Sequence, residues 1–208
     1  MKKVEAKKIF NSKVEFLLGA HNLGQVPSWH YEEIAFIGAS NVGKSSLINA
    51  LIGKKVAIVS STPGRTRQLN FFKFSGFKDG FILVDMPGYG YAKAKEKNII
   101  HWQETSIKYL SSRKNLRRVF LLIDGIKGLK NHDLEIIDIF NDLGISFQII
   151  LTKIDKLNKE SSKKLQAELQ NQAQIWPAMF PEVIAVSSQK GYGIHDIQDA
   201  IVEILKNL

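Results

Sequence analysis

The chain has 208 residues, of which 44% are hydrophobic, and this length and composition suit one α/β domain with a buried core. It contains no cysteine, which excludes a disulfide framework and a thiolate metal site. The 29 lysines and arginines outnumber the 20 aspartates and glutamates, and the resulting net charge of +9 favours polyanionic partners.

The beginning of the chain is rich in lysine, and no apolar run of signal-peptide length follows it. No stretch approaches the roughly 18 apolar residues that suggest a membrane span. We therefore expect a cytoplasmic protein that does not contact a membrane. Residues 1–32 are interpreted as an N-terminal extension that packs on the main domain through Phe16, Leu18 and Trp29.

Short apolar runs typical of buried strands recur along the remaining chain, at residues 34–37, 81–84, 119–123, 148–151 and 183–186. Segments of helical period separate most of them; their apolar positions are Leu134, Ile137, Phe140 and Leu143 in one, and Ile194, Ile197, Ile201 and Ile204 in another. This alternation predicts a parallel sheet with helices on both faces.

One pair of strands should depart from the parallel arrangement. Residues 68–74 meet residues 81–84 across Lys78, Asp79 and Gly80, a sequence typical of a hairpin turn, which predicts an antiparallel pair. The expected fold of residues 33–208 is a three-layer α/β/α domain. Its sheet is predicted to have six strands, mostly parallel, with one antiparallel strand.

A phosphate-binding loop follows the first predicted strand directly. Its residues are Gly38, Ala39, Ser40, Asn41, Val42, Gly43, Lys44, Ser45 and Ser46, and a helical run follows them. They match the P-loop pattern in its required strand–loop–helix context, although a ligand-free glycine-rich turn is the alternative interpretation. Glycines let backbone N–H groups wrap a β-phosphate, and the helix start adds a positive field. We expect Lys44 to neutralise the β and γ oxygens and Ser45 to ligate Mg²⁺.

A second phosphate-side motif ends the strand at residues 81–84. Asp85 stands at the carboxyl end of this strand and is followed by Met86, Pro87 and Gly88. We expect Asp85 to hold Mg²⁺ through a water molecule and the Gly88 N–H to sense a γ-phosphate. An aspartate that ends a strand is often structural, but here the sheet should bring it beside the P-loop.

The segment between the P-loop and the hairpin has turn chemistry. Thr66 is the candidate second Mg²⁺ ligand and γ-phosphate sensor, with Thr62 as the alternative. Arg65 and Arg67 either approach the γ-phosphate or contact a phosphate backbone or solvent. The nucleotide-binding residues expected in this segment are Gly64, Arg65, Thr66, Arg67 and Gln68. Catalysis is assigned to Lys44, Thr66 and Gly88.

The choice between adenine and guanine depends on the motif after the strand at residues 148–151. It consists of Thr152, Lys153, Ile154 and Asp155. The Asp155 carboxylate can accept hydrogen bonds from guanine N1–H and N2–H₂, whereas adenine offers no matching pair of donors. The Lys153 stem should cover the base face. A later strand ends in Val186, Ser187 and Ser188, which can offer backbone N–H groups to the guanine carbonyl.

In chain order, these segments resemble the five nucleotide motifs of the TrmE-Era-EngA-EngB-Septin-like P-loop GTPases. The sequence most resembles the EngB family, also called YihA or YsxC, of bacterial ribosome-biogenesis GTPases. The closer match lies in residues 61–66, 85–92 and 152–155. Thr152 departs from the asparagine common in the wider class, but threonine is usual in EngB-like proteins.

The resemblance implies GTP hydrolysis to GDP, a role in late assembly of the large ribosomal subunit, rRNA-rich particles as partners, and a requirement for normal cell division. We expect a monomer. Two basic stretches flank the expected nucleotide-sensing loops, and each is either an RNA-binding surface or a solvated helix face. Their basic residues are Lys54, Lys55, Arg65, Arg67, Lys73 and Lys78, and then Lys93, Lys95, Lys97, Lys108, Arg113, Lys114, Arg117 and Arg118.

Ras-like enzymes orient the attacking water with a glutamine directly after the glycine of the third motif, and Tyr89 stands at that position. We therefore expect slow intrinsic hydrolysis, accelerated by a partner that orders residues 60–67 and 86–98. Asn41 resembles the asparagine that ligates K⁺ in several related GTPases. Three outputs stay open: a GTP-gated binding state, an enzyme of metabolism or RNA modification, and a nucleotide-stabilised RNA- or ribosome-binding scaffold with negligible turnover.

Overall fold

A computed structural model describes residues 2–54, 68–90 and 105–207. Within these ranges the chain forms a seven-stranded sheet with the strand order β1-β3-β4-β2-β5-β6-β7. The strands are β1 (Val14–Ala20), β2 (Glu32–Gly38), β3 (Leu69–Phe74), β4 (Phe81–Asp85), β5 (Leu116–Asp124), β6 (Phe147–Thr152) and β7 (Ile184–Ala185).

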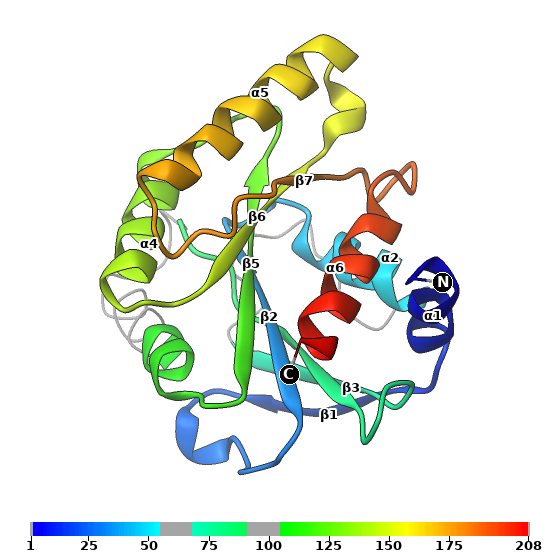
Figure 1. Cartoon of the computed structure of the whole chain (residues 1–208). Coiled ribbons are helices and arrows are strands. Elements are labelled where there is room, and N and C mark those ends of the chain that lie inside the picture. Colours follow the sequence, from blue (N-terminus) through cyan, green and yellow to red (C-terminus); the bar gives the residue numbers. More distant parts are fainter. Residues whose placement is uncertain (1, 55–67, 91–104, 208) are drawn as a thin grey trace.

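Helices cover both faces of this sheet, as Figure 1 shows. One face carries α1 (Lys2–Phe10), α2 (Lys44–Ile52) and α6 (Ile194–Lys206). The other face carries α4 (Asn131–Asp142), α5 (Lys159–Asn171) and the helical residues 105–112. Three short 3₁₀ helices complete the described elements: η1 (Leu23–Gln25), η2 (Ile154–Lys156) and η3 (Gln172–Gln174). The three-layer α/β/α prediction is confirmed.

The parallel strands end at one edge of the sheet, and this edge positions the functional residues. β2 pairs in parallel with β4 and β5, and the parallel order continues through β6 and β7. Phe36 is level with Asp85, Gly38 with Leu122, and Asp124 with Thr152. The predicted hairpin is also present, because β3 pairs antiparallel with β4.

The strand count of the prediction was wrong. β1, from the N-terminal extension, pairs antiparallel with β3 and makes the sheet seven-stranded, with two antiparallel pairs. The pairing register shifts between Phe16 and Leu18, as at a β-bulge. Because a bulge breaks the two-residue alternation of side chains, this strand lacks the pattern by which strands are recognised. Leu18 packs against the hydrophobic core that contains Leu69 and Phe71. Phe16 is 56% exposed and lies beside the ring of Phe72.

The helices bury one stripe each, as helical periodicity requires. In α6, Ile194, Ile197 and Ile201 are buried as predicted. In α4 the buried positions are Asp133, Ile136, Ile137 and Phe140, while the predicted core positions Leu134 and Leu143, the latter directly after the helix, are 38% and 48% exposed. The buried face of α4 differs from the predicted one because it includes a polar residue, Asp133. A prediction from the spacing of apolar residues does not count such a position. None of the helices within the described ranges has both the length and the hydrophobicity of a membrane-spanning segment.

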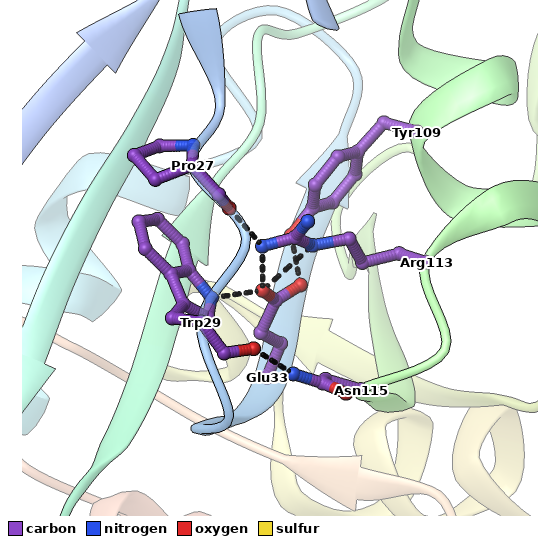
Figure 2. Close-up of polar contacts among 6 residues, drawn as sticks. All are labelled: Pro27, Trp29, Glu33, Tyr109, Arg113 and Asn115. Atoms are coloured by element: carbon purple, nitrogen blue, oxygen red, sulfur yellow. Dashed lines mark hydrogen bonds and ion pairs between the residues drawn. The ribbon is translucent and has the colours of Figure 1, made fainter.

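Figure 2 shows a buried carboxylate, that of Glu33, to which Trp29 of the extension and Tyr109 are hydrogen-bonded. Glu33, at the start of β2, is fully buried and accepts hydrogen bonds from Trp29 Nε1, Tyr109 Oη and Arg113 Nε. The Arg113 guanidinium also donates to the Pro27 carbonyl at 2.9 Å. Residues 27–29 and the helix over residues 105–112 are therefore fastened to the same strand.

Candidate functional site: a nucleotide-binding edge

Residues 38–43 form a tight turn between β2 and α2. Asn41 has φ of 67° and Gly43 has φ of 102°, both in the left-handed region that lets a short loop curl back on itself. A Cβ at Gly38 would lie 2.9 Å from Leu122 Cβ, so no larger residue fits where the loop leaves the sheet. The loop therefore has the curvature that a phosphate-wrapping backbone needs.

The first residue of α2 contacts the end of β4. Lys44, 8% exposed, directs its ammonium group at the Asp85 carboxylate, which is 2% exposed, and the two groups form a hydrogen-bonded ion pair. Ser45 follows on the same helical turn and is half-buried. Lys44 can offer its ammonium group to phosphate oxygens, and the Asp85 carboxylate and the hydroxyl of Ser45 are the kind of oxygen ligands that Mg²⁺ prefers.

The motif after β4 lies directly against the P-loop. Ser40 N–H donates to the Tyr89 carbonyl at 2.9 Å, and Tyr89 N–H donates to the Gly38 carbonyl at 3.3 Å. A Cβ at Gly88 would lie 3.2 Å from Ser40 Oγ and 3.3 Å from the Gly38 carbonyl oxygen. Gly88 therefore sits where only a glycine fits comfortably, and its backbone runs alongside the loop that would hold the phosphates.

The predicted base motif is tied to the same loop. Thr152 Oγ1 lies 2.8 Å from the Val42 carbonyl oxygen and 3.1 Å from that of Ile123, so its hydroxyl donates to the P-loop or to β5. Lys153 Nζ donates to the Asn41 carbonyl and to Asp124 Oδ2, each at 2.7 Å. The Lys153 stem consequently crosses the P-loop surface, in the position that would let it cover a planar base.

Asp155 lies beside the segment that follows β7. The Ser187 hydroxyl donates to its carboxylate and holds the pKa of Asp155 below its ordinary value, with smaller contributions from Lys156 and Lys190. Ile154 N–H donates to the Val186 carbonyl at 3.2 Å. Asp155 is therefore ionised at neutral pH and accepts hydrogen bonds only, which is the chemistry that a guanine edge requires. Ser188, which follows Ser187, is half-buried.

Not every predicted residue falls within the described part of the chain. Gly64, Arg65, Thr66 and Arg67, and the alternative Thr62, lie outside the described residues. Gln68 is described, and its Nε2 donates to Asn70 Oδ1 at 2.9 Å while its side chain lies against Gly19. In this conformation the Gln68 amide is engaged by a strand residue.

Two acidic residues of the site were not predicted from the sequence. Asp124 ends β5, is 8% exposed, and accepts hydrogen bonds from Lys153 Nζ and from the Ile126 N–H at 2.9 Å. Asp133, on the first turn of α4, accepts from the Tyr89 hydroxyl at 2.7 Å. The signal that could have found Asp124 is its place at the carboxyl end of a buried strand, as for Asp85.

A cavity of about 130 Å³ adjoins these two residues. It lies between the P-loop, Gly90 and the start of α4, and its polar lining includes Ser40, Lys127, Lys130 and His132. The cavity therefore borders the phosphate side of the site rather than the base side.

Several predicted surface cations are engaged within the fold. Arg113 pairs with Glu33, Arg117 with Glu32, and Lys73 donates to the Tyr31 hydroxyl at 2.6 Å. Lys54, Lys78, Lys108 and Lys114 are exposed. The described part of the two basic stretches thus offers solvent fewer free charges than their composition indicates.

Comparisons with known proteins identify the family of the chain. A family model described as 50S ribosome-binding GTPase matches residues 33–153. A probable GTP-binding protein EngB of Brucella melitensis is 42% identical over 97% of this chain and 87% of its own length. A protein of the same name from Chelativorans sp. is 44% identical over 94% of this chain and 90% of its own length.

Solved structures show the same fold. Aquifex aeolicus Era bound to GDP·AlF₄⁻ superposes with a TM-score of 0.69 at 25% identity, over 83% of this chain and 56% of that chain. Era in complex with MgGDPNP and nucleotides 1506–1542 of 16S ribosomal RNA superposes with a TM-score of 0.68 at 24% identity, over 84% of this chain and 57% of that chain. With the P-loop and the base motif on one sheet edge, and with this identity to curated relatives over nearly its whole length, the chain belongs to the EngB family of GTP-binding proteins.

Proposed function

We propose that this chain is a Mg²⁺-dependent GTPase that acts as a switch in late assembly of the large ribosomal subunit, in the cytoplasm. The observation that carries the nucleotide assignment is the convergence of Lys44, Asp85 and Asp155 on one edge of the sheet, joined through Lys153 to the P-loop. The Lys44 ammonium group would then bind the phosphates and the Asp155 carboxylate would bind the guanine edge, with Lys153 linking the base motif to the P-loop.

The metal would be held by Ser45, by Thr66 and, through water, by Asp85. Bound Mg²⁺ would neutralise charge on the β and γ oxygens of GTP. Two residues of the chain would bind the phosphates directly. Lys44 would turn from Asp85 toward them, and the Gly88 N–H would sense the γ-phosphate. Era, a neighbour of the same fold, has been solved with MgGDPNP, which supports this choice of metal.

Slow intrinsic hydrolysis is part of the proposal. Tyr89 stands where Ras-like enzymes carry the water-orienting glutamine, and its hydroxyl donates to Asp133. This buried hydroxyl is held by α4, so it is not free to take the place of the glutamine side chain. Acceleration would then require a partner that acts on residues 60–67 and 86–98. Participation of K⁺ through Asn41 stays a prediction without support from the relatives.

A ribosomal partner is supported by chemistry and by relatives. The net charge of +9 attracts RNA, the matching family model is described as ribosome-binding, and the structure of Era contains ribosomal RNA. The large subunit and the link to cell division are carried over from the EngB resemblance. As for domain organisation, we propose that residues 1–32 form an N-terminal extension of a domain formed by residues 33–208, with β1 of the extension joining the sheet of that domain.

Co-sedimentation with separated ribosomal subunits tests the proposal. The protein would be compared with GDP and with a non-hydrolysable GTP analogue at two salt concentrations, because nonspecific attraction to RNA weakens steeply with salt. Retention on the large subunit only with the analogue, at both salt concentrations, supports the switch. Equal, salt-sensitive retention on both subunits contradicts it. Multiple-turnover GTP hydrolysis, measured in parallel, separates a GTPase from a scaffold with negligible turnover.

A further inference from the structure

Tyr89 is held at three separate atoms. Its backbone N–H donates to the Gly38 carbonyl at 3.3 Å, and its carbonyl accepts from the Ser40 N–H at 2.9 Å. Its hydroxyl donates to Asp133 Oδ1 at 2.7 Å, at the start of α4. One residue thus joins the P-loop to a helix that contributes no predicted nucleotide ligand.

The receiving carboxylate is itself fixed. Asp133 is 3% exposed, and its Oδ2 accepts from the Lys130 N–H at 2.9 Å, which closes the first turn of α4. The Tyr89 side chain is also 3% exposed, and its ring lies edge-on to the ring of His132 at 5.6 Å. Removing one partner from such a pair leaves a buried polar group without its hydrogen bond, which is costly.

The residue before Tyr89 is the one that this arrangement positions. Gly88 lies against Ser40 and Gly38, and its backbone continues directly into the anchored Tyr89. A displacement of Tyr89 toward or away from α4 therefore moves the Gly88 N–H relative to the P-loop. The next residue, Gly90, has φ of 74°, a conformation suited to a change of chain direction immediately after the anchor.

We propose that Tyr89 is a positioning residue and that its hydrogen bond to Asp133 sets the Gly88 amide at the distance from the P-loop that γ-phosphate recognition requires. This inference rests on the proposed GTPase function. It assigns Tyr89 no role in orienting water, because its hydroxyl is buried and held by Asp133. It also assigns a function to α4, whose Asp133 would hold Tyr89 and thereby the neighbouring Gly88 N–H in place.

The test compares Tyr89→Phe and Asp133→Ala with the unmodified protein, because an asparagine at position 133 would still offer an amide oxygen to the Tyr89 hydroxyl. The affinities for GDP and for a non-hydrolysable GTP analogue would be measured by titration, together with the single-turnover rate of GTP hydrolysis. Each variant should lower the ratio of analogue to GDP affinity about tenfold, the size expected for one lost buried hydrogen bond to a charged group. GDP affinity should stay within about twofold, because the β-phosphate site is not displaced. The double variant should lose no more than the worse single variant, since both changes remove the same contact.

Tyr109→Phe is the matched control, because Tyr109 is also a buried tyrosine that donates to a buried carboxylate, that of Glu33. It should reduce stability without changing the ratio of the two affinities. An unchanged ratio in both Tyr89→Phe and Asp133→Ala overturns the inference, as does a double variant whose losses add. If the unmodified protein fails to bind either guanine nucleotide, the proposed function is refuted and this inference with it. If it binds both and only the variants behave unexpectedly, the inference alone is refuted.

Discussion

Lys44 and Asp85, 41 positions apart in the sequence, form a buried ion pair between the first turn of α2 and the end of β4. Each charge compensates the other inside the fold, where an isolated charge would be costly. In the proposed nucleotide complex Lys44 would turn from Asp85 to the phosphates, so the ion pair would link the stability of the ligand-free protein to the phosphate site.

Lys44→Ala should abolish nucleotide binding at every Mg²⁺ concentration and should also destabilise the protein by about 3–5 kcal/mol, because it leaves Asp85 buried without a partner. Urea denaturation measures the second effect and fluorescent-nucleotide titration the first. The double variant Lys44→Met/Asp85→Asn should recover much of the stability but no nucleotide binding. Retained GTP affinity in Lys44→Ala would refute the phosphate assignment.

Asp155→Asn should shift base preference from guanine to xanthine. The amide offers one acceptor and one donor, so it no longer matches the two donors of guanine but does match the carbonyl of xanthine. The loss for GTP should reach the order of 10⁴-fold, as for other sites built around a polar group of the substrate. Competition between GTP and XTP measures the change. Glu160→Gln, at an exposed carboxylate on the first turn of α5, is the control; an Asp155 variant that still prefers GTP would remove Asp155 from the base site.

Glu33→Gln should destabilise the fold by about 3–5 kcal/mol, because the amide cannot replace a buried carboxylate that accepts from Trp29, Tyr109 and Arg113. The neighbouring Glu32→Gln is a sharp control. Glu32 pairs with Arg117 at the surface, where side-chain exposures are 27% and 36%, and such a pair contributes about 0–1 kcal/mol. Chemical denaturation of both variants distinguishes them, and equal losses would contradict the role given to the Glu33 cluster.

Stability should fall at alkaline pH because of two buried tyrosines. Burial, reinforced by the charges of Asp133 and Glu33, raises the pKa of both Tyr89 and Tyr109 well above the ordinary value of 10.0. Below that value the folded and unfolded chains both keep these protons. Above it the unfolded chain loses them and the folded chain does not, so each tyrosine lowers the free energy of unfolding by about 1.4 kcal/mol per pH unit.

Urea denaturation between about pH 9 and pH 11 measures this dependence. The double variant Tyr89→Phe/Tyr109→Phe lacks both titrating groups, so its stability should decline less steeply with pH over the same range. Identical slopes in the two proteins would show that other groups control the alkaline transition.

The P-loop, the base motif and the hairpin could be predicted because each is specified by residues that are neighbours in the sequence. The P-loop needs glycines and a lysine within nine residues, between a strand and a helix, and the base motif needs four residues after a strand. The antiparallel hairpin was predictable for the same reason, from its turn at Lys78, Asp79 and Gly80 and the apolar runs on each side.

Tertiary structure alone decided the partners of these residues. The contacts of Lys153 with Asp124 and of Tyr89 with Asp133 span 29 and 44 positions, and no local pattern marks the acceptor in either pair. β1 joins the sheet through a bulged register that removes the alternation of side chains. The sequence by itself therefore determined the fold class and the ligand-binding motifs, whose periodicity and spacing are local. Which buried charges compensate one another depends on which segments the sheet brings side by side, because a side chain far along the chain becomes a partner only when folding closes the intervening loop.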